Sequence, residues 1–162
     1  MIRYFFIVPL VFYITGCGFS PLHNFSNSMD LFKKIDIKAE DTFIAFLIEE
    51  ALEERAPFGE NPRFRLNVKP TIKNSYGVIT KENEITRYSV TLRVDYSLYN
   101  NENGKLLAKK SVSATSDYSA AVTYTGFATE IARKDTYERL ADLVAEKMII
   151  EILINFSSEF SN

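Results

Sequence analysis

The stretch that decides the fold is residues 86–98, which read TRYSVTLRVDYSL. From Tyr88 to Leu98 every second residue is aliphatic or aromatic, and the residues between them are polar or charged. Strict alternation over this length is typical of a β-strand that buries one face and exposes the other to water. The sequence therefore predicts a long strand with one apolar face and one wet face.

Two further strands are predicted around it. Residues 63–73 alternate in the same way, and Pro70, which lacks an amide donor, places that strand at a sheet edge or at a bulge. Residues 100–104, NNENG, have the composition of a hairpin loop that ends in a glycine. The partner strand then runs over about 105–118, with Lys110 as a charged exception on its inner face. The other residues expected to face inward on it are Leu106, Ala108, Val112 and Ala114.

A short strand and a helix are predicted before this meander. Residues 33–38 alternate around two isoleucines, and Asp41 then offers a helix N-cap. Apolar residues follow at helical spacing, and Pro57 and Gly59 stop the helix. The expected buried stripe is Ile44, Leu47, Ile48, Ala51 and Leu52.

A long helix is predicted at the end of the chain, from about Ala128 to Phe156. Its apolar residues recur three or four positions apart, which gives one continuous stripe. The expected stripe is Ile131, Tyr137, Leu140, Ala141, Val144, Met148, Ile152 and Phe156, widened by Ile149 and Leu153.

The predicted order is β-α-β-β-β-α, an α+β fold. Each predicted helix has one apolar stripe, and the predicted sheet has one apolar face. All of these apolar surfaces are buried when both helices pack on the same side of a four-stranded mixed or antiparallel sheet. The other sheet face then stays polar, and the first two strands can pair in parallel through a right-handed crossover. We expect one domain over residues 33–157 and a short tail over 158–162.

The N-terminus reads as a lipoprotein signal over residues 1–16. Arg3 precedes an apolar run that is too short to span a bilayer, which takes about 20 residues. The run ends in Ile14-Thr15-Gly16-Cys17, which resembles the bacterial lipobox. We therefore expect Cys17 to carry acyl chains such as palmitate, and residues 17–32 to form a tether. The alternative is an ordinary signal peptide with an incidental cysteine.

Composition argues against an enzyme and against several kinds of site. The 162 residues carry a net charge of −2 and contain one cysteine and one histidine, His23. These counts exclude an intramolecular disulfide framework, a cysteine-rich zinc site and paired-histidine metal motifs. The absence of a basic excess argues against nucleic acid as a partner. No nucleotide-binding or hydrolase motif occurs, so we expect no cofactor and no metal.

The most informative constellation is the wet face of the predicted sheet. Only Asp95 and Asp117 are acidic there. Arginine suits phosphate because its planar fork donates two hydrogen bonds, and side chains from neighbouring strands can converge on one anion. The alternative is that these cations only keep an exposed sheet soluble. The candidate anion-contact residues are Arg63, Arg65, Lys69, Lys73, Arg87, Arg93 and Lys109.

One resemblance to a known family covers the mature chain. The segment from Gly16 to Leu22, GCGFSPL, resembles the opening of the lipopolysaccharide-assembly lipoprotein LptE family, especially its alphaproteobacterial form. Shorter similarities follow in the same order: ITRY at 85–88, DYSL at 95–98, and ARKD at 132–135 followed by RLA at 139–141.

The resemblance implies a non-enzymatic outer-membrane lipoprotein. Such a protein sits one-to-one within the LptD β-barrel, helps it assemble, and acts as a plug while lipopolysaccharide is delivered to the outer leaflet. It also implies contact with lipopolysaccharide, for which the cationic face is the candidate. Gly18, standing where an aspartate would signal inner-membrane retention, favours the outer membrane. The alternatives are a lipid-anchored periplasmic scaffold subunit of another envelope assembly machine, and a tethered hydrolase for which no nucleophile–base set is visible.

Overall fold

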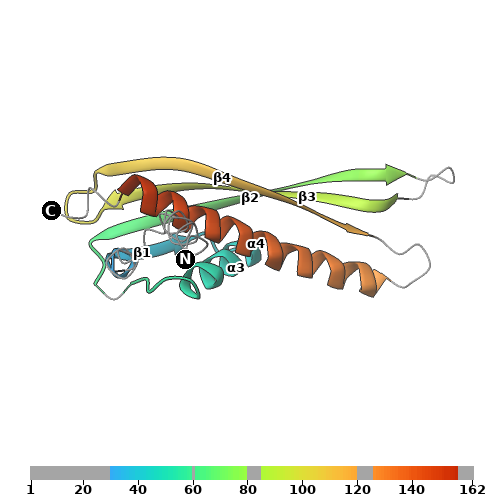
Figure 1. The fold of residues 1–162 in the computed structure, drawn as a ribbon, viewed down its shortest axis with the longest axis horizontal. Helices are drawn as coiled ribbons and strands as arrows, with labels where there is room; N and C mark the ends of the chain where they lie inside the picture. The colour runs from blue at the N-terminus through green and yellow to red at the C-terminus, as the bar shows by residue number, and fades with distance from the viewer. Residues whose placement is uncertain (1–29, 60, 80–84, 120–125, 157–162) are drawn as a thin grey trace, which may run out of the picture.

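The computed structural model describes residues 30–59, 61–79, 85–119 and 126–156. Within these ranges the elements follow the predicted order β-α-β-β-β-α, with one 3₁₀ turn in front (Figure 1). They are η1 (Phe32–Lys34), β1 (Ile35–Ala39), α3 (Phe43–Glu53), β2 (Phe64–Ile79), β3 (Ile85–Asn100), β4 (Leu106–Ser119) and α4 (Gly126–Phe156).

The four strands form one mixed sheet in the order β1-β2-β3-β4. β1 runs parallel to β2, from the pair Ile35–Phe64 to the pair Ala39–Val68, so it covers only the first residues of β2. β2 and β3 pair antiparallel along nearly their whole length, and β4 pairs antiparallel with β3. The first two strands, which are joined through α3, pair in parallel as the sequence predicted.

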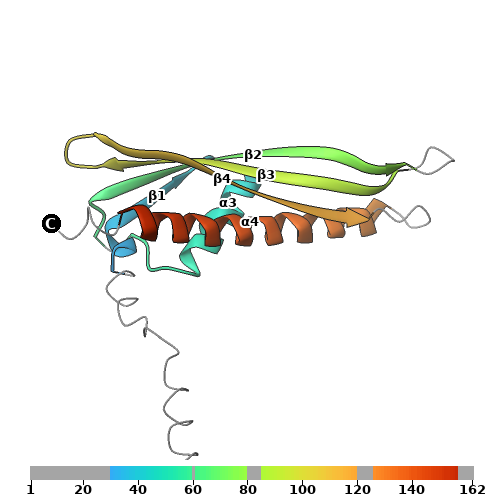
Figure 2. The same ribbon diagram turned by 45° about the horizontal axis from the view of Figure 1, so that its top comes forward.

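Both helices pack on one face of the sheet, called here the inner face (Figure 2). The alternation of β3 sets the register, because every second residue from Val90 to Leu98 is buried. β2 contributes Leu66 and Val68 to the same core, and β4 contributes Val112 and Ala114. The two-faced strand predicted from the sequence is therefore confirmed, and no helix of the described residues covers the opposite, outer face of the sheet.

The first helix begins at a threonine. We predicted Asp41 as the N-cap, but the cap is Thr42, whose Oγ1 accepts a hydrogen bond from the Ala45 amide at 3.3 Å. Threonine and aspartate both cap helices, so neighbouring candidates are hard to separate from sequence. At the other end, Arg55 Nη1 donates to the Ala51 carbonyl at 2.7 Å and Nη2 donates to Asp142 Oδ1 at 2.7 Å. This arginine ties α3 to α4.

The stripe of α4 is buried along its second half but not at its beginning. Leu140, Val144, Met148 and Ile152 are fully buried, as predicted. Ile131 was predicted to be buried but is 46% exposed. The first turns of α4 lie beyond the part of the sheet that α3 covers, so α3 does not pack beside them. The side chain of Phe156 lies outside the described residues.

A polar bond connects the sheet to α4 inside the core. The Tyr96 hydroxyl donates to Glu151 Oε2 at 2.7 Å, and Tyr96 is 1% exposed. Burial, together with this bond to a carboxylate, raises the pKa of Tyr96 well above its usual range. The phenol therefore remains a neutral donor at any physiological pH.

The turn between β3 and β4 follows the prediction for residues 100–104. Gly104 adopts a φ of +67°, a conformation that glycine reaches without steric cost, and the Asn100 amide donates to the Lys105 carbonyl at 2.9 Å. The register shifts between Leu98 and Tyr99, so Leu106 lies opposite Tyr99 on the outer face. Our placement of Leu106 inside was therefore wrong: the side chain is 46% exposed.

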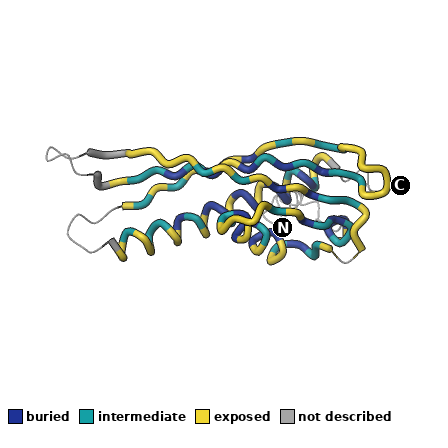
Figure 3. Tube along the Cα trace, turned by 180° about the vertical axis from the view of Figure 1, so that it is seen from behind, coloured by how far each residue is buried: buried dark blue, intermediate teal, exposed yellow. Residues whose placement is uncertain are grey.

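The molecule has two unlike halves. The proximal half contains β1, α3 and the β3–β4 turn, and most buried residues lie there (Figures 1 and 3). The distal half contains β2 beyond Ile72, the strand residues paired with it, and the start of α4. Its inner face carries a row of tyrosines, one from each long strand: Tyr76 packs edge-on against Tyr88 at 5.7 Å, and Tyr88 stacks on Tyr118 at 5.1 Å between ring centroids. Tyr76 is 68% exposed.

Candidate functional site

The outer face of the sheet holds the residues that the sequence singled out. Side chains that pair directly across strands share a face, so Lys69 lies opposite Asp95, Lys73 opposite Thr91, and Lys109 opposite Ser97. Six of the seven predicted cations stand on the strands themselves. Arg63 was predicted on a strand, but β2 begins one residue later, at Phe64. Arg63 lies at the border of the outer face, where its amide donates to the Lys34 carbonyl.

Three of the seven cations form ion pairs with other residues that the structure describes. Arg93 Nη2 lies 2.9 Å from Asp95 Oδ1. Lys69 Nζ lies 3.5 Å from Glu40 Oε1, and Arg63 Nη2 lies 3.6 Å from Glu102 Oε1. The hydrogen bonds from Arg93 lower the pKa of Asp95, and the charges of Lys109 and Lys69 lower it further. Asp95 is therefore the anionic centre of a group of three cations.

Arg65 is held by an aromatic ring. Its guanidinium carbon lies 5.5 Å from the centroid of the Tyr99 ring, which stands directly opposite on β3. Its Nε is buried and has no hydrogen-bond partner among the described residues. The stacked position explains how a charged side chain is half-buried on a mostly wet face.

Lys73, Arg87 and Lys109 have no carboxylate within 4.0 Å among the described residues. These three side chains do not lie close to one another on the sheet. Lys73 pairs with Thr91, which is four residues along β3 from Arg87 and so about 13 Å away at the backbone. Lys109 lies near the other end of the sheet. The spacing suits an extended anionic surface better than one small ion.

Two further charged residues, Asp36 and Lys38, lie on this face although the sequence pattern did not single them out. Lys38 pairs with Asn67 in the parallel register, and Asp36 pairs with Arg65, so both side chains belong to the outer face. Lys38 Nζ lies 3.7 Å from Asp36 Oδ2. The alternation of β1 around Ile35 and Ile37 was the available signal, but assigning it to a face required the register with β2.

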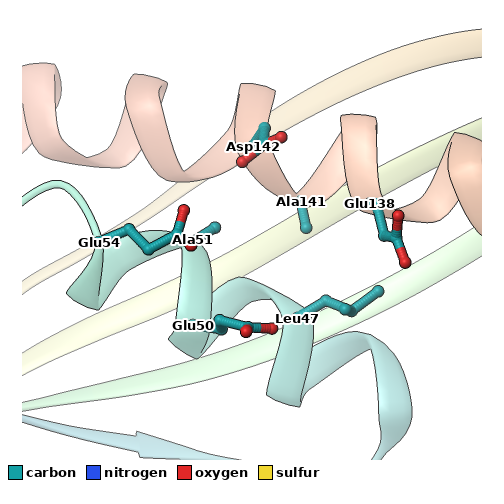
Figure 4. Close-up of a pocket in the computed structure, with 7 residues that line it drawn as sticks. All are labelled: Leu47, Glu50, Ala51, Glu54, Glu138, Ala141 and Asp142. Carbon is teal, nitrogen blue, oxygen red and sulfur yellow. The ribbon is translucent and has the colours of Figure 1, made fainter.

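A pocket of about 270 Å³ lies between α3 and α4, on the side away from the sheet (Figure 4). Three of the carboxylates that line it already have cationic neighbours: Asp142 and Glu54 both lie beside Arg55, and Glu138 lies 3.8 Å from Lys134. No three acidic, histidine or cysteine side chains of the described part of the chain are placed to hold a metal ion. The lining contains neither a nucleophile nor a histidine. It consists of Leu47, Glu50, Ala51, Glu54, Glu138, Ala141 and Asp142.

The predicted lipidation site, Cys17, lies outside the described residues, as does His23. Among the helices that the structure describes, none has the length and apolar character that crossing a membrane requires. The membrane attachment expected from the sequence therefore stays a prediction about the N-terminal segment.

Comparison with known proteins gives a fold match and no sequence match. No protein-family model matches the chain, and a search of curated proteins finds no significant relative. A Caulobacter crescentus chain classed as a lipoprotein superposes with a TM-score of 0.68 at 18% identity, over 82% of this chain and 97% of that one. Rare lipoprotein B from Shewanella oneidensis gives 0.58 at 12% identity, over 79% and 98%. Lipoprotein B from Nitrosomonas europaea gives 0.60 at 13% identity, over 78% and 85%. The chain therefore has the fold of a group of bacterial lipoproteins.

Proposed function

We propose that this chain is a lipid-anchored outer-membrane protein of the LptE type, which faces the periplasm. In this role it plugs an LptD-type β-barrel, supports its assembly, and takes part in delivering lipopolysaccharide to the outer leaflet. The observation that carries the proposal is the fold shared with structures described as lipoproteins, in a chain whose residues 16–22 resemble the start of that family. The role is non-enzymatic.

The shape of the molecule supports a plug. β2 and β3 have 16 residues each, which corresponds to about 50 Å of extended strand. The long helix α4 runs along the same axis, so the whole is a narrow wedge (Figure 2). The lumens of outer-membrane barrels are polar, and the outer face of this sheet presents charged and hydroxyl side chains.

Contact with lipopolysaccharide is the finer part of the proposal. Phosphate groups carry the charge that arginine and lysine recognise, and Lys73, Arg87 and Lys109 have no carboxylate within 4.0 Å among the described residues. Their wide spacing matches several phosphates on a surface rather than one. Carboxylates of a barrel wall are the other anions that this face could meet.

Purification from the outer membrane tests the partner. The full chain, tagged at its C-terminus and extracted in mild detergent, should co-purify with a large β-barrel that mass spectrometry identifies as LptD-type. Capture of a different envelope machine instead would favour a scaffold role and overturn the plug.

Charge reversal separates the two anions. Arg87→Glu combined with Arg93→Glu should reduce lipopolysaccharide binding if the face meets phosphates, and should reduce barrel recovery if it meets the wall. The matched control is Lys134→Glu with Arg139→Glu, which makes the same charge change at exposed positions of α4. If both readouts are unchanged at low ionic strength while circular dichroism shows a folded protein, the face is only a soluble surface.

The anchor is tested by Cys17→Ala in cells labelled with radioactive palmitate. The variant should lose the label and appear in the soluble periplasm. Equal labelling of the variant and the wild type would contradict lipidation at Cys17.

A further inference from the structure

The tyrosine row of the distal half, formed by Tyr76, Tyr88 and Tyr118, runs straight across three strands. Tyr76 pairs directly with Tyr88, and Tyr88 pairs directly with Tyr118. Directly facing residues share one face of the sheet, and neighbouring strands lie about 4.8 Å apart. The three rings therefore stand side by side on the inner face, at the spacing of the strands.

The row is open at its β2 end and bordered by α4 at its β4 end. Tyr76 is 68% exposed, and Asn74, on the same face of β2, is exposed as well. Burial raises the pKa of Tyr118, and the nearby phenol of Tyr137 on α4 raises it further. The guanidinium carbon of Arg133 lies 5.7 Å from the centroid of the Tyr137 ring. Within the described residues, the row is therefore a platform with one wall.

The platform is aromatic and polar, and its described residues carry no net charge. The phenols and Asn74 are neutral, and Ser116, which faces Val90 across the strands, adds a hydroxyl on the same face. Arg133 is a cation at the wall, and it forms an ion pair with Glu130. The candidate anion-contact residues lie on the other face of the sheet. The two faces therefore suit different ligands, with charged groups on the outer face and neutral groups on the inner one.

The hydroxyls of the tyrosine row have no hydrogen-bond partner among the described residues, and these side chains contact one another through their rings. A phenol can donate one hydrogen bond and accept others, and covering it without a partner costs free energy. An acyl chain offers no such partner. A sugar offers several hydroxyls, together with an apolar ring face whose C–H groups pack on the electron-rich face of an aromatic ring.

From this combination we infer that the tyrosine row is a binding platform for a short run of uncharged sugar residues. One sugar packs its apolar face on the ring of Tyr76, and the next exchanges hydrogen bonds with Tyr88 and Asn74. The identity of the glycan rests on the proposed function, because in an LptE-type plug these sugars belong to the saccharide part of lipopolysaccharide. The glycan of the cell wall is the other source of such sugars in the envelope.

Titration of the full lipoprotein in detergent tests the platform. The protein carries ring-labelled tyrosine, and its nuclear magnetic resonance shifts are followed as a lipopolysaccharide oligosaccharide, freed of lipid and phosphate, is added. We expect saturable shifts of the Tyr76, Tyr88 and Tyr118 rings and none of Tyr96, which is buried in the proximal half. An N-acetylglucosamine oligomer, which stands for the cell-wall glycan, is titrated in parallel. The absence of shifts in the row with both glycans overturns the proposal.

Substitutions at the open end of the row test the contact itself. Tyr76→Ala should weaken oligosaccharide binding about tenfold, because the ring that packs on the sugar is lost. Tyr76→Phe keeps the ring and should retain most of the affinity. The matched control is Phe46→Ala, which removes a 60% exposed ring from α3, outside the row, and should leave binding unchanged. Equal affinity of the wild type and Tyr76→Ala, with both folded by circular dichroism, overturns the proposal.

The two glycans separate the platform from the proposed function. Shifts with the lipopolysaccharide oligosaccharide alone support both the platform and the source named here. Shifts with the N-acetylglucosamine oligomer alone support the platform but overturn that source. If no LptD-type barrel co-purifies while the oligosaccharide still binds, the plug role fails and the platform stands. A photo-crosslinker at position 76 that captures a protein in intact membranes, with no shift from either glycan, assigns the row to a protein contact and overturns the proposal.

Discussion

The proximal and distal halves of the sheet share the same three long strands but differ in what covers them. In the proximal half, α3 and α4 together seal the inner face, and β1 adds a fourth strand. In the distal half α4 is the one described helix that follows the sheet, beneath β4, and the inner face of β2 is exposed at Asn74 and Tyr76. The comparison shows that strand pairing alone can extend a sheet beyond the hydrophobic core. The burial of apolar side chains against the helices then determines which part of the sheet is more stable.

The largest expected effect is a cavity where both helices press on the sheet. Leu92 is fully buried, so Leu92→Ala should lower the free energy of unfolding by about 2–5 kcal/mol. Thr91→Ala, on the outer face of the same strand, should cost far less. Thermal and urea melts check this; the reverse order would mean that the strand register is displaced by one residue.

The second largest effect is expected from removing the Tyr96 hydroxyl, which lies in the proximal half. Tyr96→Phe leaves the Glu151 carboxylate without its donor in a half-buried place and should cost about 1–3 kcal/mol. Adding Glu151→Leu should recover part of the loss, because the uncompensated acceptor is then gone. Urea denaturation of both variants measures the difference, and an unchanged midpoint for Tyr96→Phe would show that water satisfies Glu151 instead.

The distal half should respond more weakly. Tyr76→Ala removes a mostly exposed ring that touches Tyr88, so we expect a loss of about 1 kcal/mol or less. Hydrogen exchange should show the amides of residues 73–76 opening more readily than those of residues 64–68. Equal protection of the two segments would remove the distinction between the halves.

The smallest effect is a pH response of the outer face. Arg93 lowers the pKa of Asp95 below its unfolded value of about 3.9, so the ionised carboxylate adds stability above that pH. The contribution is lost as the pH falls from about 4 through the lower folded pKa. Asp95→Asn should therefore show a shallower acid destabilisation than the wild type in melts across this range. Identical acid profiles would show that the pair contributes nothing measurable.

Much of the fold could be predicted because the patterns are local. The alternation of residues 86–98 gave both faces of β3, and helical spacing gave the buried stripe of α3. The prediction ended β2 at residue 73 because its apolar alternation ends at Ile72, yet the strand continues to Ile79 because β3 pairs with it there. Leu106 is exposed because the register of β4 with β3 shifts next to it, and no local sequence pattern indicates that shift.

The candidate site was less predictable, because its electrostatics depend on distant pairs. The contact of Lys69 with Glu40, and that of Arg65 with Tyr99, join residues that the sequence gives no reason to match. Sequence alone could place the cations on one face, but not say which of them are neutralised. Whether that face meets lipopolysaccharide, a barrel wall or only water stays a prediction.

The parallel pairing of β1 has a consequence for how the chain folds. β2, β3 and β4 form a meander of neighbouring hairpins, which need only short loops to close. β1 instead joins β2 across the whole segment from Ala39 to Phe64, including α3, so its contacts require a longer closure. We therefore expect β1, although it is the first strand along the chain, to pair after the other three strands. The meander is the natural folding nucleus, and the proximal half, although it is the better packed of the two, is completed late.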